Sequence, residues 1–133
     1  MIVNILFWLF MLAMDLLIPG VMLGFGKEFQ KNPPAEINPG YGYRTTMSMK
    51  NKLTWDFAQK YMGEVWDRAG RWLLIPSALP LVLVLGRDVG TVGMAGLAVC
   101  GVQLVVMLGT ILVVERALKK NFDKNGKKKT ETD

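Results

Sequence analysis

The sequence predicts an all-α integral membrane protein with three transmembrane helices and one cytoplasmic, interfacial amphipathic helix. Its N-terminus is expected outside the cell and its C-terminus in the cytoplasm. Hydrophobic residues make up 51% of the 133 residues and charged residues 20%, and the two kinds are segregated along the chain. Two runs of 24 residues, 2–25 and 91–114, are almost wholly apolar. A helix of about 20 apolar residues crosses the hydrocarbon core of a bilayer.

The first apolar run is predicted to be a retained helix rather than a cleaved secretory signal. No Lys or Arg precedes it, it is longer than a signal segment, and no small-residue cleavage site follows. We therefore expect one membrane domain over residues 1–118. Its expected parts are spans at about 2–25, 66–86 and 91–114, a motif loop and amphipathic helix over 27–70, and then a basic, disordered cytoplasmic tail over 119–133.

The middle span is the shortest. Residues 72–86 form an apolar run of 15 residues, about 22 Å of helix against a hydrocarbon core of about 30 Å. An earlier start would lengthen it, with Arg68 and Arg71 reaching the headgroups. Pro76 and Pro80, one turn apart, should bend it. A re-entrant hairpin is the competing interpretation.

Charge placement favours three spans. Residues 27–71 carry eight Lys and Arg, the chain from Arg116 carries seven, residues 87–90 carry one, and none precedes the first run. Three spans put both basic segments on one side, as the positive-inside rule requires. The net charge of +5 comes mainly from the tail. It indicates the lipid bilayer as a partner and needs no nucleic acid.

The polar segment between the first two spans contains the most specific sequence. Residues 38–42 carry strong turn chemistry. Ser48 is the expected helix N-cap. Residues 51–69 then predict an amphipathic helix, because apolar side chains recur there at steps of three and four.

Little in the chain suggests catalysis. There is no histidine, and the lone Cys100 lies within an apolar run as an expected packing residue. No nucleophile–base pair is evident, so a membrane enzyme acting on lipid headgroups ranks last. We expect no catalytic residue, no metal site and no cofactor.

Arg44 is the sharpest binding candidate. It follows a glycine-rich turn and precedes the hydroxyl residues Thr45 and Ser48. A guanidinium, hydroxyls and helix N-terminal amides can together bind a carboxylate or a lipid phosphate. The alternative is structural, with Arg44 bonded to carbonyl groups of the turn or paired with a carboxylate.

Asp15 and Gln103 are polar residues inside expected spans. A charge at that depth costs at least about 2.5–3.5 kcal/mol, so Asp15 is a functional candidate. We expect it to contact Arg44 or Arg68; the alternative is a neutral Asp15 bonded to Asn51 or Gln103. Gln103 is expected to bond between helices. The pair Gly20 and Gly24 allows close helix approach, within the chain or in a homo-oligomer.

The polar segment carries a spaced motif over about 22 residues. Its residues are Asn38, Gly42, Tyr43, Arg44, Thr45, Ser48, Asn51, Trp55 and Ala58. In this register the segment resembles the SdpI/YfhL family of small bacterial membrane proteins, whose pattern is N-x-x-x-G-Y-R-T-x-x-S-x-x-N-x-x-x-W-x-x-A-N. The last position is the departure, since Gln59 stands where the family usually has Asn.

The resemblance implies a multi-pass protein of the bacterial inner (cytoplasmic) membrane. It implies immunity to a membrane-active antimicrobial peptide toxin, and a signalling role through a cytoplasmic repressor, as in the family's best-known member. That member has additional spans before the motif domain, whereas this sequence is expected to form the three-span motif domain only, as in the shorter YfhL-like members. The alternative function is an oligomeric transport module for lipids or small solutes, with Asp15, Gln103 and the bent middle helix lining a polar path.

Overall fold

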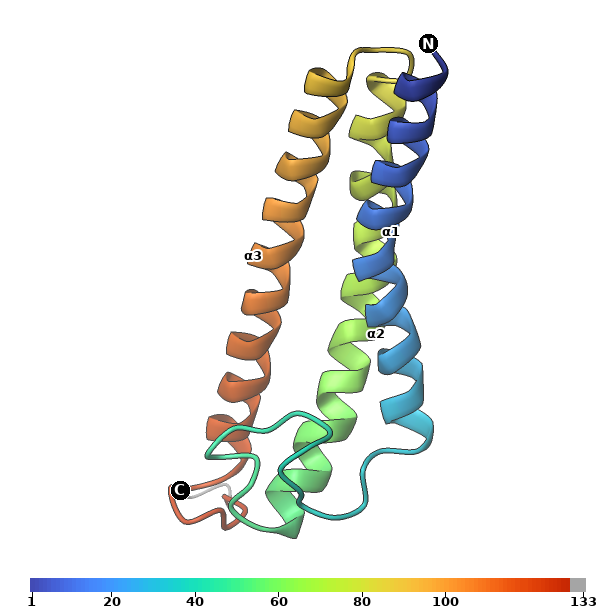
Figure 1. Cartoon of the computed structure of the whole chain (residues 1–133). Coiled ribbons are helices and arrows are strands. Elements are labelled where there is room, and N and C mark those ends of the chain that lie inside the picture. The colour runs from blue at the N-terminus through green and yellow to red at the C-terminus, as the bar shows by residue number, and fades with distance from the viewer. Residues whose placement is uncertain (130–133) are drawn as a thin grey trace. The chain divides into compact units, whose positions relative to one another are not determined.

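The computed structural model describes residues 1–129, and these form three long helices (Figure 1). Helix α1 is Ile2–Lys31, α2 is Lys52–Leu83 and α3 is Val89–Asn121. The described residues contain no strand, and one isolated bridge joins Phe122 to Lys128. The chain is therefore all-helical, as predicted. α1 and α3 are each long and apolar enough to cross a membrane.

The expected amphipathic helix and short middle span are not separate elements. α2 runs without a break from Lys52 to Leu83 and contains both Pro76 and Pro80. Its start also differs from the expectation, because Asn51 and not Ser48 is the N-cap. Asn51 Oδ1 accepts from the Thr54 amide at 3.0 Å, and Thr54 Oγ1 accepts from the Asn51 amide at 3.1 Å. This reciprocal capping satisfies donors that the first helical turn leaves free.

The other helix ends follow from local chemistry. α1 ends just before Pro33 and Pro34, which cannot continue its hydrogen bonding. Asp88 caps α3, accepting from the Thr91 amide at 3.3 Å and from the Thr91 hydroxyl at 2.6 Å. These bonds to Thr91 lower the pKa of Asp88. α3 continues to Asn121, beyond the expected end at residue 114, and so includes the first residues of the expected tail.

Two compact units divide the chain. Unit 1 comprises Met1–Leu23 and Arg68–Leu108, and unit 2 comprises Gly24–Asp67 and Gly109–Asp133. Unit 1 has a small apolar core of Leu81, Val92 and Val99. The Trp8 indole adds a hydrogen bond to the Leu81 carbonyl. Each of its three helical segments also exposes large apolar side chains, while Asp15, Ser77 and Gln103 are buried.

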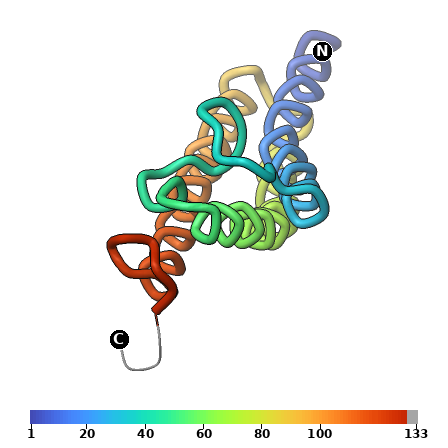
Figure 2. The backbone as a smooth tube through the Cα atoms, turned by 90° about the horizontal axis from the view of Figure 1, so that it is seen from below, coloured from blue at the N-terminus to red at the C-terminus, as the bar shows by residue number. Residues whose placement is uncertain are grey.

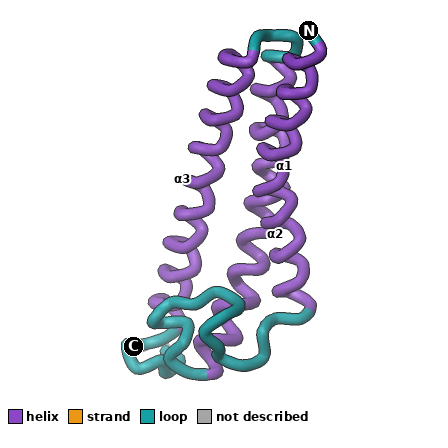
Figure 3. Tube along the Cα trace, viewed as in Figure 1, coloured by secondary structure: helices purple, strands orange, loops and turns teal. Residues whose placement is uncertain are grey.

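Unit 2 contains the polar segment and a larger core. Two loops lie side by side in it: the motif loop, residues 32–51, and the C-terminal loop, residues 122–129 (Figure 2 and Figure 3). The buried apolar cluster at its centre draws on α1, the motif loop, α2, α3 and the C-terminal loop. Its members are Phe29, Tyr43, Ala58, Met62, Val65, Val114, Leu118 and Phe122.

Close helix approach in unit 2 occurs at Gly26 and Gly63. A Cβ on Gly26 would lie 2.7 Å from the Asp67 amide nitrogen, and one on Gly63 would lie 2.9 Å from the Gly26 carbonyl oxygen. By contrast, a Cβ on Gly20 or Gly24 would meet nothing within 4 Å in the part of the chain described. Gly26 and Gly63 therefore let α1 and α2 approach within this unit.

Candidate functional site

The motif loop begins with a turn that Asn38 organises. Asn38 Oδ1 accepts from the amides of Gly40 at 3.0 Å and Tyr41 at 2.7 Å. Gly42 follows with φ +111°, a conformation that other residues rarely adopt. The predicted turn at residues 38–42 is therefore present.

Gln59 of α2 holds the peptide groups of Tyr43. Its Oε1 accepts from the Tyr43 amide and its Nε2 donates to the Tyr43 carbonyl, each at 2.7 Å, and both bonds are buried. A Cβ on Gly42 would lie 2.8 Å from Gln59 Oε1, so this approach requires glycine. Trp55, also on α2, donates from its indole to the Pro34 carbonyl at 2.7 Å. Gln59 and Trp55 thus fasten the loop to the helix that follows it.

Ser48 and Thr45 close the second half of the loop. Ser48 Oγ accepts from the Thr45 amide at 2.8 Å, and Thr45 Oγ1 accepts from the Ser48 amide at 3.2 Å. Ser48 Oγ also lies 3.2 Å from the Tyr43 carbonyl, to which it can donate. Both hydroxyls therefore bond within the loop. We had expected the Ser48 hydroxyl to cap the N-terminus of α2, and it does not.

Tyr43 ties the loop to α3. Its hydroxyl donates to Glu115 Oε1 at 2.7 Å, and the Ile111 carbonyl lies 3.3 Å away. Burial, followed by the neighbouring Glu115 carboxylate, raises the pKa of the Tyr43 phenol well above its usual range. The phenol therefore stays neutral and keeps donating this bond at physiological pH. The sequence held no signal for the pairing of Tyr43 with Glu115.

A cavity of about 300 Å³ lies where the motif loop meets α2 and α3. Trp66, in its wall, donates from its indole to Thr110 Oγ1 at 3.1 Å. The wall combines aromatic, apolar, hydroxyl and guanidinium groups, and such mixtures are typical of ligand pockets. Its residues are Gly42, Tyr43, Arg44, Thr45, Met62, Trp66, Thr110 and Ile111.

Arg44 lines this cavity and is exposed to solvent. Its Nη1 donates to the Pro39 carbonyl within the turn. This bond matches the structural alternative to an anion site, in which Arg44 bonds to carbonyl groups of the turn. A guanidinium has five N–H donors, so a bond through Nη1 leaves others for a ligand.

Asp15 lies in a separate polar cluster within unit 1, where its side chain is fully buried. Its Oδ1 accepts from Cys100 Sγ at 3.3 Å. The expected arginine partner, Arg44 or Arg68, was therefore wrong. Cys100, which was expected as a packing residue, also donates this hydrogen bond. Asp15 Oδ2 is buried with no hydrogen-bond partner among the described residues.

Gln103 connects this cluster to the backbone of α1. Its Nε2 donates to the Asp15 carbonyl oxygen and, at 2.8 Å, to Ser77 Oγ. Pro19, four residues after Asp15, has no amide hydrogen, so the Asp15 carbonyl lacks its usual donor within the helix. The predicted interhelical role of Gln103 is confirmed. The sequence analysis missed Ser77 as a partner of Gln103. It also missed the open Asp15 carbonyl, which the spacing from Asp15 to Pro19 could have indicated.

The described residues include no group of three or more His, Cys, Asp or Glu side chains that could hold a metal ion.

A comparison with known families matches residues 35–114 to the SdpI/YfhL protein family. The matched stretch contains the motif loop, α2 and most of α3. No curated protein and no solved structure matches the chain. With two apolar helices of spanning length and a family match over more than half of its residues, the chain is a membrane-protein candidate that belongs to the SdpI/YfhL family.

Proposed function

We propose that the chain is a non-enzymatic, multi-pass protein of the bacterial cell membrane that gives resistance to a membrane-active antimicrobial peptide. Membership of the SdpI/YfhL family supports an immunity-type role. The observation that carries the proposal is the cavity beside Tyr43 and Arg44, because the family-matched motif builds one of its walls.

The chemistry of this cavity suits part of an amphipathic peptide. A volume of about 300 Å³ has room for a few side chains and not for a whole peptide. Met62, Trp66 and Ile111 offer apolar contact, and Arg44 adds a cation at the rim. A peptide carboxylate could pair with the free guanidinium donors while an apolar side chain enters the cavity.

Three membrane spans form part of this proposal, with the N-terminus outside and the C-terminus inside. α2 supports a third span because Trp72, Ile75 and Leu83 are each 74% exposed, on a segment where water would disfavour them. The buried Asp15 and Gln103 also suit a bilayer, in which polar side chains turn inward.

Topology can be tested by cysteine labelling in intact cells. In a Cys100→Ala background, single substitutions Lys50→Cys, Asp88→Cys and Lys124→Cys would be exposed to a membrane-impermeant maleimide. We expect labelling at position 88 only. Labelling at position 124 but not at 50 would mean that α2 does not cross the membrane, and would refute three spans.

Function is tested by survival of a peptide-sensitive bacterial host that expresses the chain. The host would be challenged with a panel of membrane-active peptides. We expect the wild type to raise the inhibitory concentration of at least one peptide, and Arg44→Ala to remove most of that protection. Arg116→Ala, an exposed arginine that does not line this cavity, should protect like the wild type. If no peptide is resisted, or both variants fail equally, the proposal is wrong.

The signalling part of the proposal concerns a cytoplasmic repressor. Unit 2 would hold it, since this unit contains the polar loops. Toxin-dependent movement of a fluorescent repressor to the membrane would test this part separately.

The alternative function is an oligomeric module that handles lipids or small solutes. Two buried oxygens favour it, Asp15 Oδ2 and Gln103 Oε1, because neither has a partner among the described residues. A polar path through the membrane would need such unpartnered hydrogen-bond acceptors. Solute flux in proteoliposomes that is lost in Asp15→Leu would support the alternative over immunity.

A further inference from the structure

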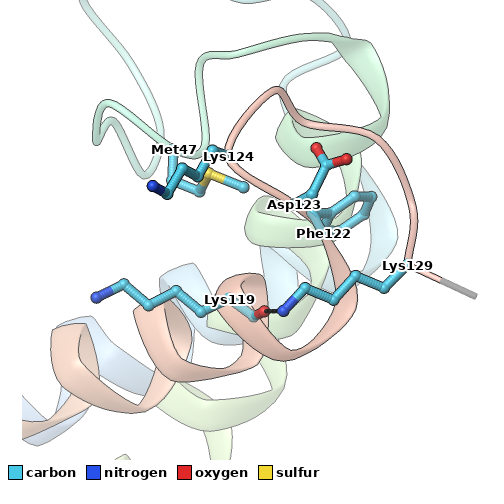
Figure 4. Close-up of a pocket in the computed structure, with 6 residues that line it drawn as sticks. All are labelled: Met47, Lys119, Phe122, Asp123, Lys124 and Lys129. Carbon is cyan, nitrogen blue, oxygen red and sulfur yellow. Dashed lines mark hydrogen bonds between the residues drawn. The ribbon is translucent and has the colours of Figure 1, made fainter. Parts of the chain in front are cut away.

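A second cavity in unit 2, of about 440 Å³, lies where the C-terminal loop meets the end of α3 and the motif loop (Figure 4). We call it the lysine pocket. It is lined by Met47, Lys119, Phe122, Asp123, Lys124 and Lys129. None of these residues belongs to the family motif or to the cavity beside Arg44.

The C-terminal loop that forms the pocket is fastened at several points. The Asp123 amide donates to the Lys127 carbonyl at 2.8 Å, and the Gly126 carbonyl accepts from Asn51 Nδ2, also at 2.8 Å. The Phe122 ring packs edge-on against Phe57, with ring centroids 5.5 Å apart. The pocket is therefore formed in advance of any ligand.

Two of its four charged residues, Asp123 and Lys129, already make hydrogen bonds to backbone groups that hold the loop in place. Lys129 Nζ donates to the Lys119 carbonyl at 2.7 Å, near the end of α3 (Figure 4). Asp123 Oδ1 accepts from the amides of Asn125 and Lys127, each at 2.9 Å. Both charges thus stabilise the loop itself.

The other two charges are available to a ligand. Lys119 and Lys124 are exposed, and neither ammonium has a hydrogen-bond or ion-pair partner in residues 1–129. Figure 4 shows both side chains ending on the same side of the pocket, which Met47 also lines. The Met47 thioether and the Phe122 ring supply the apolar part of the lining. Two cations beside an apolar wall suit an anionic amphiphile.

The place of the pocket along α3 identifies the amphiphile. Leu112 is 62% exposed and apolar, and Lys119 follows seven residues later. Seven residues of helix span about 10 Å. If α3 crosses a bilayer, this step leads from its hydrocarbon edge into the headgroup layer.

We propose that the lysine pocket binds an anionic phospholipid, with the phosphate between Lys119 and Lys124 and the glycerol backbone against Met47 and Phe122. The inference rests on α3 lying in a membrane and not on peptide resistance. Its failure can therefore be told apart from failure of the immunity proposal, which the survival assay tests.

The test uses purified full-length protein in a neutral detergent, titrated with phosphatidylglycerol or with phosphatidylcholine of the same acyl chains. Retained lipid is counted by native mass spectrometry. The double variant Lys119→Gln/Lys124→Gln is compared with Lys27→Gln/Lys31→Gln, which removes two exposed lysines at the end of α1. Circular dichroism checks that every variant keeps its helix content.

We expect the wild type and the Lys27/Lys31 variant to prefer phosphatidylglycerol. The Lys119/Lys124 variant should bind it roughly thirtyfold more weakly, from the usual contribution of two lysines at a membrane surface. Met47→Gln, which keeps both lysines, should weaken it several-fold. Equal retention of both lipids by the wild type would overturn the proposal, as would equal losses in the two double variants. Displacement of the lipid by inorganic phosphate alone would make this a phosphate site and would also overturn it.

Discussion

Replacing Gln59 by methionine removes both hydrogen bonds that hold the Tyr43 peptide groups while nearly keeping the side-chain volume. The Tyr43 amide would then be buried without a partner, which costs about 1–3 kcal/mol. The Tyr43 carbonyl would keep Ser48 Oγ at 3.2 Å, so its loss is smaller, about 0.5–1.5 kcal/mol. Together they predict a loss of roughly 1.5–4.5 kcal/mol in the free energy of unfolding.

The measurement is equilibrium unfolding of the purified protein in mixed micelles of increasing SDS content, followed by tryptophan fluorescence. Gln30→Met is the matched control, because Gln30 is an exposed glutamine whose side chain donates at 3.1 and 3.3 Å to carbonyls of the helices. We expect it to lose less than 1 kcal/mol, as is usual at surface positions.

A second variant tests the reasoning more strictly. Ser48→Ala combined with Gln59→Met removes both side-chain partners of the Tyr43 carbonyl. The double variant should therefore lose more stability than the sum of the single variants, because only then is the carbonyl orphaned. A Gln59→Met protein as stable as the wild type, or strictly additive losses, would refute the role we assign to Gln59.

Three further outcomes are expected in the same unfolding assay. Gly42→Ala should cost roughly 1–3 kcal/mol from its positive φ alone, whereas Gly40→Ala, with its nearest contact at 4.0 Å, should be nearly neutral; equal losses would contradict this. Gln103→Leu should cost about 1 kcal/mol for two interhelical bonds, and no loss would mean that the open Asp15 carbonyl finds another partner. The raised pKa of Tyr43 means that the folded state holds a proton that the unfolded state releases above about pH 10. The contribution of Tyr43 to stability should thus be constant below that pH and fall above it, and Tyr43→Phe should lessen the fall at alkaline pH.

The helices were the most predictable part of the fold. The apolar runs that became α1 and α3 are too long for other structures, so their existence followed from composition. The ends of these helices did not follow from composition. α1, for example, continues through polar residues such as Lys27 and Glu28, which lie beyond the apolar run. α2 looked like two segments, since its pattern changes from amphipathic to apolar near Arg71 while its backbone continues.

The candidate site was predictable as a segment and not as a set of contacts. Turn chemistry located residues 38–42, and the motif singled out Gln59. The pairing of Gln59 with Tyr43 needs the loop to fold back over 16 residues, which no local periodicity records. Gln103 and Asp15 lie 88 residues apart, and the sequence offered Gln103 as one of several partners of Asp15 without indicating that the bond would go to the Asp15 carbonyl. Long-range hydrogen bonds of this kind depend on packing that the sequence does not display.

The dual engagement of Asn51 affects how mutants of this chain should be interpreted. Its Oδ1 caps α2 at Thr54, and its Nδ2 anchors the C-terminal loop at Gly126. In an alanine scan, Asn51→Ala would therefore cause two defects at once. It would fray the start of α2 and release the C-terminal loop. Asn51→Asp separates them, because a carboxylate still caps Thr54 but cannot donate to Gly126. For the same reason, a fusion that replaces the chain from residue 126 onward would alter the motif's own helix cap, and a reporter is better attached elsewhere.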